Sequence, residues 1–376
     1  MQVTYEIVST PARMAEIRPA WDSLWQRCGG ELFQSHDWLS AWWDAEQAKS
    51  VRIGCAWQGD RLIAVLPLCI RRWQGIRVLQ WAAQPFSDYC DVLMQAPLGV
   101  LEALWMRATR RGGFDLVRLK HVRSSAAIRP LISMLGMAEE RVEVCLQVAG
   151  DWPDGESWFR NLNKKTRNNH TRGRRILDES GSIVIRQLGE DEPREATICR
   201  LLQLKRLWSN NRGSPLVRND TTLLALANAL DRLGCLRIYV MECDGTIIAG
   251  SVNAVHGDRM LALFATYDPA YDRAGPGIIL MTEYTKTAFD EGLTEVDYLL
   301  GCESYKFKFA NQRSEVYIYV RGYTWVGRLA LAGYRWWQRR RPTEQAVSIG
   351  SAYLTEKGTP RCTVPKPAKA RESSYS

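Results

Sequence analysis

The chain has 376 residues, of which 46% are hydrophobic and 24% charged, so it is long enough for two domains with sizeable cores. No apolar run approaches the ~20 residues that span a bilayer, and the N-terminus lacks the apolar block of a signal peptide, so we expect a cytoplasmic protein. Residues 324–376 carry +7 of the net charge of +9, so the rest of the chain lacks the basicity typical of nucleic-acid-binding proteins.

The ten cysteines and four histidines are scattered along the chain, and no cysteine pair has C-x-x-C spacing. Zinc sites and disulfide frameworks need clustered ligands or paired cysteines. We therefore expect neither, and no bound metal.

In the first half, apolar spacing predicts a helix over 14–27, and Ser35 is a suitable N-cap for a Trp-rich helix that follows. Short β-like runs then alternate with turns, and a helix near 100–111 leads to the strand "FDLVRLKHV". The β-like runs are "VRIGCAWQ", "RLIAVLPLCIRRW", "IRVLQWA" and "CDVLMQ".

A polar junction at 151–157 precedes a segment, 160–175, with seven Lys or Arg and no acidic residue. A strand, "IVIRQL", and two helices, 194–208 and 221–233, come next. Three β-runs then fill 236–268, with turns at "CDG" and "HGD". A glycine turn, a helix over 277–291 and the strand "EVDYLL" follow, so the second half repeats the plan of the first.

This repetition predicts an α/β protein made of two tandem modules, each a mixed, mostly antiparallel sheet flanked by helices. We expect the modules to span 1–150 and 151–323. The remaining part, 324–376, reads as a basic amphipathic helix, "WVGRLALAGYRWWQRRRP", followed by a polar tail that we expect to be disordered.

The turn "RAGPG", 273–277, stands where a β-run gives way to a helix. Helix N-termini leave amides unpaired, and glycine lets an anion approach them. Ala274, Gly275 and Gly277 would then offer amides to a pyrophosphate, while Pro276 fits the first helical position. The alternative is a plain strand-to-helix turn. Neither G-x-x-x-x-G-K-[ST] nor G-x-G-x-x-G occurs.

A meander, a glycine turn, a helix and a strand in this order resemble the GNAT acyl-CoA transferases over 236–300. A narrower resemblance, over about 32–320, is to the CelD-like (cellulose-biosynthesis) acetyltransferases, relatives of the Fem aminoacyl-transferases. It rests on "LFQSHDWLSAWWDA", "LNKKTRNNHTRGRRIL", "DGTIIAG", "YDPAYDRAGPGIIL" and "VDYLLGCESYKFKFA". The sequence departs from the family at Asp272, where GNAT proteins commonly have Gln or Arg.

The resemblance implies acyl-CoA, in particular acetyl-CoA, as co-substrate. The backbone of Leu263, Phe264, Ala265 and Thr266 would then bind the pantetheine arm, and Arg273, together with the turn amides, the diphosphate. Lys306 would meet a phosphate or an acidic group of the substrate. The alternative for the β-run is that its amides are ordinary ladder groups.

The resemblance also implies catalytic roles. Tyr305 would protonate the departing thiolate, and Asp297 would be a general base or the partner of Lys306, unless it lies at a strand end in solvent. Glu283 is a weaker candidate base. Strand alternation offers another alternative for "SYKFKF", in which Tyr305 and Phe307 pack inside while Lys306 and Lys308 face water.

Trp208 and Arg212 lie before the second meander and would bind the acceptor, Trp208 by stacking on a sugar and Arg212 by pairing with a carboxylate. The alternative is a core tryptophan beside a surface loop. The basic segment 160–175 would meet an anionic polymer, a membrane or tRNA, unless it is simply solvated. The terminal helix would lie on anionic lipid, unless Trp325, Leu329 and Trp336 pack on the body.

Three functions follow. The first is an acyl-CoA-dependent N-acyltransferase acting on an amine or amino sugar, in exopolysaccharide or envelope metabolism. The second is Fem-like aminoacyl transfer from tRNA, which we rank lower because the second module has no room for the long helical arm of Fem proteins. The third is a non-catalytic accessory protein of polysaccharide synthesis, a reading that Asp272 and Pro276 favour.

Overall fold

The computed structural model describes residues 2–211 and 219–340, so Arg212 and the expected polar tail lie outside the described residues. The first module runs from β1 to β7. Its elements are β1 (Val3–Val8), α1 (Pro11–Glu16), α2 (Arg18–Cys28), η1 (Leu32–Gln34), α3 (His36–Glu46), β2 (Val51–Gln58), β3 (Arg61–Trp73), β4 (Ile76–Trp81), η2 (Gln84–Phe86), β5 (Leu93–Met94), α4 (Leu98–Arg110), β6 (Leu116–Arg123), α5 (Arg129–Met134) and β7 (Ala138–Ala149).

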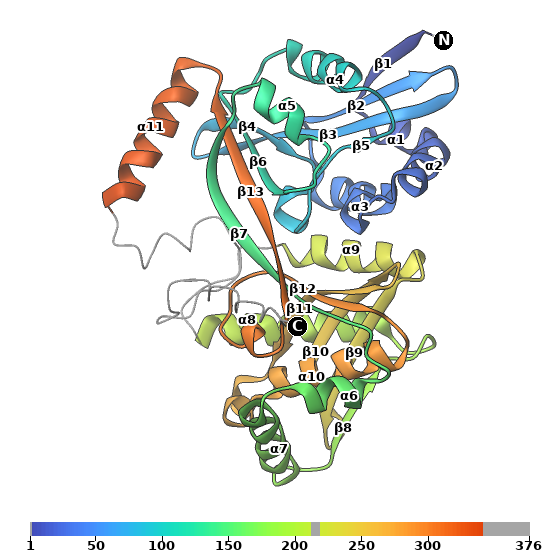
Figure 1. The fold of residues 1–376 in the computed structure, drawn as a ribbon, viewed down its shortest axis with the longest axis vertical. Coiled ribbons are helices and arrows are strands. Elements are labelled where there is room, and N and C mark those ends of the chain that lie inside the picture. The colour runs from blue at the N-terminus through green and yellow to red at the C-terminus, as the bar shows by residue number, and fades with distance from the viewer. Residues whose placement is uncertain (1, 212–218, 341–376) are drawn as a thin grey trace, which may run out of the picture.

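The second module repeats the order of meander, helix and strand, and a last helix follows it (Figure 1). Its elements are α6 (Gly155–Asn161), α7 (Lys164–Asp178), β8 (Ile183–Gln187), α8 (Arg194–Asn211), α9 (Asp220–Arg232), β9 (Leu236–Cys243), β10 (Thr246–His256), β11 (Arg259–Tyr267), η3 (Pro269–Ala274), α10 (Pro276–Asp290), β12 (Glu295–Leu300), η4 (Lys306–Lys308), β13 (Gln312–Gly322) and α11 (Trp325–Arg340).

Local chemistry explains several element boundaries. Ser35 caps α3 as expected, because its Oγ accepts the Trp38 amide at 3.2 Å. The single helix expected over 14–27 is wrong: α1 ends before Ile17 and α2 begins at Arg18. Pro19 lies in the first turn of α2, where a missing N–H is tolerated, but within one long helix it would remove a hydrogen bond.

All strands join one sheet, whose order is β1-β2-β3-β4-β6-β13-β7-β12-β11-β10-β9-β8, with β5 added beside β3. The order is symmetric about its centre, since the last strand of each module lies against the other module. β13 pairs with β6 and β7 pairs with β12, while β7 and β13 pair with each other. Each module holds one parallel pair, β4 with β6 and β11 with β12, so the expected mixed, mostly antiparallel sheets are confirmed.

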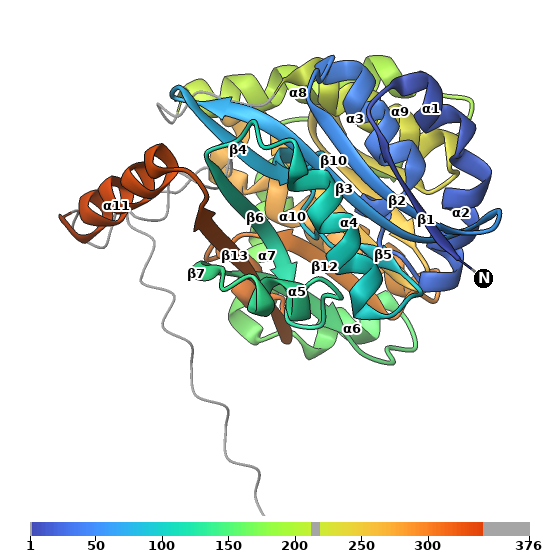
Figure 2. The same cartoon turned by 90° about the horizontal axis from the view of Figure 1, so that it is seen from above.

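Helices cover both faces of this sheet (Figures 1 and 2). On one face, the two modules share a core that combines Trp21 and Trp42 with Leu226 and Leu230. Each of the two other cores lies mostly within one module, the first under α4 and α5 and the second under α6, α7 and α10. The exchanged strands add Tyr319 of β13 to the first core and Val148 of β7 to the second.

An ion pair also crosses the boundary between the modules. Glu31 pairs with Arg123 of its own module and, at 2.9 Å, with Arg259 of the second module. Burial alone would raise the pKa of Glu31, but the two guanidinium groups lower it below its usual value. The two modules therefore pack as one body with a charged as well as an apolar interface.

Within the described residues, none of the helices combines the length and the apolar content that crossing a bilayer requires. In the same part of the chain, no group of three or more His, Cys, Asp or Glu side chains is arranged to hold a metal ion.

Candidate active site

The candidate site lies where β11 and β12 separate. The two strands pair in parallel only at their beginnings, through Arg259 with Glu295, Met260 with Val296 and Leu261 with Asp297. Beyond Leu261, β11 continues along β10 up to Tyr267 without further pairing to β12. A gap therefore opens at the carboxyl ends of two parallel strands, a usual position for ligand sites in α/β proteins.

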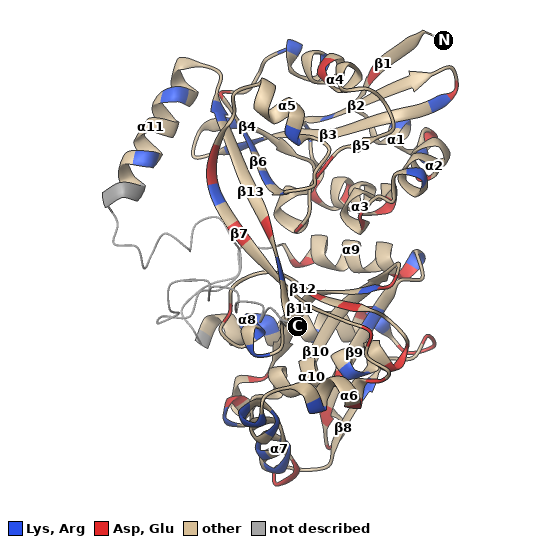
Figure 3. Cartoon of the chain, in the orientation of Figure 1, with Lys and Arg blue, Asp and Glu red and all other residues tan. Residues whose placement is uncertain are grey.

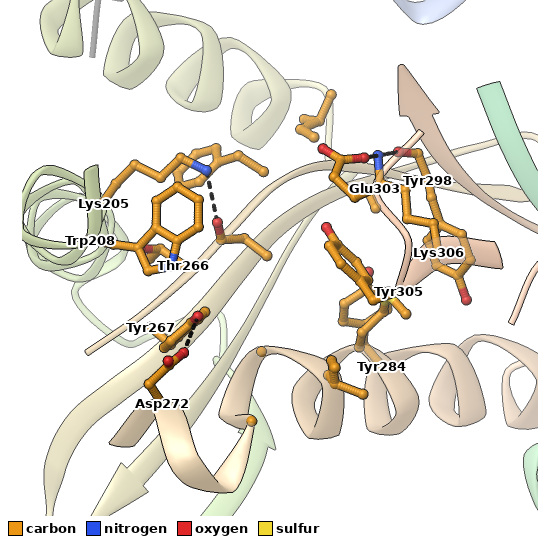
Figure 4. Close-up of a pocket in the computed structure, with 18 of the residues that line it drawn as sticks. Lys205, Trp208, Thr266, Tyr267, Asp272, Tyr284, Tyr298, Glu303, Tyr305 and Lys306 are labelled. Atoms are coloured by element: carbon orange, nitrogen blue, oxygen red, sulfur yellow. Dashed lines mark hydrogen bonds and ion pairs between the residues drawn. The ribbon is translucent and has the colours of Figure 1, made fainter. Parts of the chain in front are cut away.

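A cavity of about 460 Å³ fills this gap, and we call it the β11–β12 cavity (Figure 4). Its charged lining is balanced, with three lysines and three acids, and the rest is mostly aromatic and aliphatic. Its lining residues are Leu202, Lys205, Trp208, Asp220, Leu223, Ala262, Leu263, Phe264, Ala265, Thr266, Tyr267, Asp272, Gly275, Gly277, Ile278, Met281, Tyr284, Tyr298, Glu303, Ser304, Tyr305, Lys306 and Lys308.

The expected β-run forms one wall of the cavity. Leu263, Phe264, Ala265 and Thr266 all line it. Thr266 is 3% exposed, and its Oγ1 has no hydrogen-bond partner among the described residues. A buried polar atom without a partner costs about 1–3 kcal/mol. A hydroxyl in this state on a cavity wall is suited to bonding a ligand.

The glycine turn closes one end of the cavity. Gly275 has φ of 68°, which favours glycine, and α10 begins at Pro276, as expected. Gly277 lies in the first turn of α10. Pro276 has no N–H, and the Ile278 and Ile279 amides donate to the Gly275 carbonyl at 3.1 and 3.2 Å, so Gly277 supplies the first-turn amide without a partner within the helix. A Cβ at Gly277 would meet the Tyr267 ring at 3.1 Å, so only glycine leaves this approach open.

The rest of the turn lies away from the cavity or engages other groups. Arg273 is exposed and does not line the cavity, so its role in binding a diphosphate outside the cavity stays a prediction. Ala274 is buried against α7: a Cβ at Gly173 would lie 2.4 Å from the Ala274 carbonyl oxygen. Asp272 does line the cavity, and its Oδ1 accepts a hydrogen bond from the Tyr267 hydroxyl at 2.7 Å.

Tyr305 lines the cavity, as expected, and Glu303 lines it too, a residue that the sequence did not single out. Figure 4 shows the Tyr305 hydroxyl pointing into the cavity on the side where Glu303 lies. Burial raises the pKa values of the neighbouring Tyr284 and Tyr298. These two are poor proton donors, whereas Tyr305 and Glu303 supply an acid and a carboxylate in one space.

Lys306 is buried and donates hydrogen bonds to backbone carbonyls. It is 6% exposed, and its Nζ donates to the carbonyls of Tyr298 at 2.9 Å and Leu300 at 3.0 Å, with Glu303 at 3.1 Å. These carbonyls flank Leu299, which has φ of 56°, a rare value for leucine. The expected strand-like alternation, with Phe307 packed inside and Lys306 facing water, is wrong. The segment is a 3₁₀ turn, and Phe307 is 45% exposed.

Asp297 is neither at a solvent edge nor paired with Lys306. It is 1% exposed, accepts the Tyr89 hydroxyl at 2.6 Å and the Leu299 amide at 2.8 Å, and does not line the cavity. Burial raises the pKa of Asp297 to about 6, although both hydrogen bonds lower it. Its side chain thus lies at the module boundary and supports the bend at Leu299.

Glu283 also lies outside the cavity lining. It faces α7, where His170 Nε2 lies 3.0 Å from its Oε1. Burial alone would raise the pKa of Glu283, but the contacts with His170 and Lys286 lower it. A base needs a raised pKa and access to the substrate, so this side chain is better explained as a contact between α7 and α10.

On the opposite wall, Trp208 lines the cavity rather than filling the core (Figure 4). Its ring packs edge-on against Tyr267, with centroids 6.3 Å apart. Lys205, one helical turn earlier, donates to the Ala265 carbonyl at 3.0 Å and was not anticipated from the sequence. Arg212, the other expected acceptor residue, lies outside the described residues.

In the first module, a loop fills the corresponding place between β4 and β6. The Cys90 amide donates to the His121 carbonyl at 3.0 Å, and the Lys120 amide donates to Gln84 Oε1 at 3.0 Å. His121 has φ of 58° and occupies the position in β6 that Leu299 occupies in β12. The two modules thus share a bend, but a loop bonds to the strand edge in the first module, while the second has the β11–β12 cavity.

Comparisons with known proteins agree with this geometry. Residues 164–307 match a family model described as an acetyltransferase (GNAT) domain. No curated protein matches the sequence.

Three solved structures have the same fold. FemX has a TM-score of 0.56 at 10% identity, over 84% of this chain and 97% of that one. The C-terminal domain of a putative lysylphosphatidylglycerol synthetase from Agrobacterium fabrum has a TM-score of 0.53 at 11% identity, over 86% and 96%. L-PGS from Bacillus licheniformis has a TM-score of 0.51 at 12% identity, over 86% and 97%. The segment that matches the GNAT family model includes the glycine turn and most of the cavity wall, and the chain as a whole shares the fold of these three structures.

Proposed function

We propose that the protein is an acyl-CoA-dependent N-acyltransferase acting on an amine. The observation that carries this proposal is the β11–β12 cavity: it runs from the first turn of α10 to Tyr305, and Thr266 in its wall has a buried hydroxyl without a partner. Its balanced charge and largely apolar lining suit a pantetheine arm better than a polyanion.

The anionic end of the donor belongs outside the cavity, at the glycine turn. The Gly277 amide and the positive end of the α10 dipole would bind the diphosphate. Helix α7 adds positive charge beside this turn (Figure 3), since Arg172 and Arg174 flank the Gly173 that touches Ala274. This arrangement offsets the unfavourable carboxylate of Asp272, which the Tyr267 hydroxyl already engages.

The chemistry needs a base, an acid and donors for the oxyanion. Glu303 would accept a proton from the attacking amine, directly or through a water. Tyr305 would donate its proton to the departing thiolate. The amides on the β12-facing side of β11, beyond the last paired residue Leu261, would meet the oxyanion of the tetrahedral intermediate. Lys306 would act by holding the bend at Leu299 rather than by touching substrate.

The acceptor would enter between Trp208 and Asp220, on the α8 and α9 side of the cavity. The indole face suits stacking by a sugar ring, and Asp220, which pairs with Arg206, would accept hydrogen bonds from sugar hydroxyls while the amine faces Glu303. The CelD-like resemblance of the sequence supports exopolysaccharide or envelope metabolism as the setting. This setting is part of the proposal.

One observation favours a second candidate, aminoacyl transfer from tRNA. The exposed basic side chains of α7, including Lys164, Lys165, Arg172 and Arg175, form a charged helix next to the donor end of the cavity (Figure 3). A tRNA donor would bind tightly and with strong salt dependence. An acyl-CoA donor would not need more than the first turn of α10 and its nearest arginines.

Acetyl-CoA binding tests the donor. At about 100 times Kd, a ligand adds about 2.7 kcal/mol to the free energy of unfolding, which raises Tm by several degrees. The Gly277→Glu variant should lose this rise, because its carboxylate would occupy the anion position and its Cβ would press on Tyr267. Gly99→Glu is the matched control, since Gly99 is the second residue of α4 in the first module and has open space around it.

Mass spectrometry of an amine panel with acetyl-CoA would then identify the product. An equal Tm rise in both variants would remove the glycine turn from the donor site. Salt-sensitive tRNA binding without an acetyl-CoA response would favour the second candidate. Failure of both ligands to bind would favour a non-catalytic accessory protein.

A further inference from the structure

Helix α11 projects from the body and carries an exposed apolar stripe. Trp325, Leu329 and Trp336 are 73%, 62% and 56% exposed. They lie four and eleven positions apart, a spacing that returns to one side of an α-helix. Figures 1 and 2 both show α11 projecting beyond the end of β13. The expectation that these three side chains pack on the body is therefore wrong.

The opposite side of α11 is anchored, so the stripe has a fixed direction. Gly327 touches the backbone of Asp115, and a Cβ there would lie 1.9 Å from its carbonyl oxygen. Thr324 caps the helix by accepting the Gly327 amide at 3.1 Å and donates to Asp115 Oδ1 at 3.1 Å. Tyr334, half a turn round from Trp325, lies 6.0 Å from the guanidinium of Arg118.

Positive charge accompanies the stripe. Arg328 and Arg335 are exposed beside it, and residues 325–340 contain no Asp or Glu. Tryptophan prefers the boundary between headgroups and acyl chains, while arginine extends its charge toward phosphates. A short helix with both features lies in the plane of an anionic membrane surface.

We propose that α11 docks the protein on an anionic lipid surface. Trp325, Leu329 and Trp336 would enter the headgroup boundary, and Arg328 and Arg335 would pair with lipid phosphates. The inference stands on α11 alone and does not depend on the reaction proposed for the β11–β12 cavity.

Other occupants fit the stripe less well. A face of 16 residues is ~24 Å long and ~10 Å wide, so two copies would bury roughly 500 Å², well below the ~1,200 Å² of stable dimers. Two copies would also bring arginines together. Residues 341–376, which follow α11, have six Lys or Arg and three acidic residues. Their net positive charge would be repelled by the arginines beside the stripe.

Vesicle sedimentation tests the proposal with the full chain. Vesicles of phosphatidylcholine would be compared with vesicles holding about 30% phosphatidylglycerol, at low and high salt. The Trp325→Ala/Leu329→Ala/Trp336→Ala variant removes the stripe, and Arg328→Glu/Arg335→Glu reverses the charge. Met106→Ala/Met134→Ala is the matched control, because these side chains are 63% and 59% exposed on other helices.

We expect wild type and the methionine control to bind anionic vesicles, with binding weakened by salt. Each α11 variant should bind at least about tenfold more weakly while keeping its Tm, since the altered side chains are exposed. Absence of wild-type binding, or equal binding by the stripe variant, would overturn the proposal. A concentration-dependent dimer that the stripe variant abolishes, without vesicle binding, would also overturn it and assign the stripe to a second copy.

Discussion

Replacement of Asp297 by asparagine should change how stability depends on pH. Burial raises the pKa of Asp297 to about 6, against an ordinary value of about 3.9 in an unfolded chain. The folded protein therefore binds this proton more tightly than the unfolded chain does. The resulting stabilisation is fully present below pH of about 4 and disappears as pH rises through about 6. Asparagine does not titrate and would remove this dependence.

The two pKa values set the size of the effect. The linkage relation gives about 1.4 kcal/mol of stabilisation near pH 5 and about 0.1 kcal/mol near pH 7. Asparagine can still accept the Leu299 amide but not the Tyr89 hydroxyl, which adds a roughly constant cost of about 1 kcal/mol. The difference between the two proteins should thus grow by about 1.3 kcal/mol from pH 7 to pH 5.

Urea unfolding of both proteins between pH 5 and 7 measures this difference. Asp91, whose pKa burial also raises to about 6, is present in both proteins, so its contribution cancels. A difference that stays constant with pH would refute the reasoning, because it would mean that Asp297 titrates normally in the folded state.

Three further changes test the site. Thr266→Val should leave Tm nearly unchanged but weaken acetyl-CoA binding about fivefold, and calorimetry showing equal affinity would place the ligand elsewhere. Lys306→Met leaves two carbonyls of β12 unpaired and should cost about 2–4 kcal/mol in urea unfolding, while exposed Lys308→Met should cost under about 0.5 kcal/mol. Equal costs would contradict the role given to Lys306. Tyr305→Phe should lower kcat about 100-fold in a thiol-release assay with little change in KM, and an unchanged rate would assign the proton donor elsewhere.

The sequence predicted the tandem plan because local patterns carry it. Alternating strands, glycine turns and a following helix recur in both halves, and each pattern spans only tens of residues. The same local chemistry placed Gly275 and Gly277 at the end of the cavity. Thr266 and Tyr305, which lie in its walls, were instead expected from the family resemblance.

Long-range partners could not be predicted in this way. Asp297 bonds to Tyr89, 208 positions away, because β12 lies against the first module. Lys306 turns inward because the chain bends at Leu299, and nothing in the local alternation signals that bend. Arg273 points to solvent because its neighbour Ala274 packs against Gly173 of α7.

Because β7 and β13 each pair with a strand of the other module, the order of synthesis affects how the nascent chain folds. The edge of β6 stays unpaired until β13 (Gln312–Gly322) has been made, and β13 follows the other strands of the second module in the sequence. Until then, the amino-terminal half exposes an open strand edge, a feature that promotes aggregation. The nascent chain therefore reaches its native topology only after β13 has been made, and a gene cut at the junction should yield two insoluble halves that recover when co-expressed.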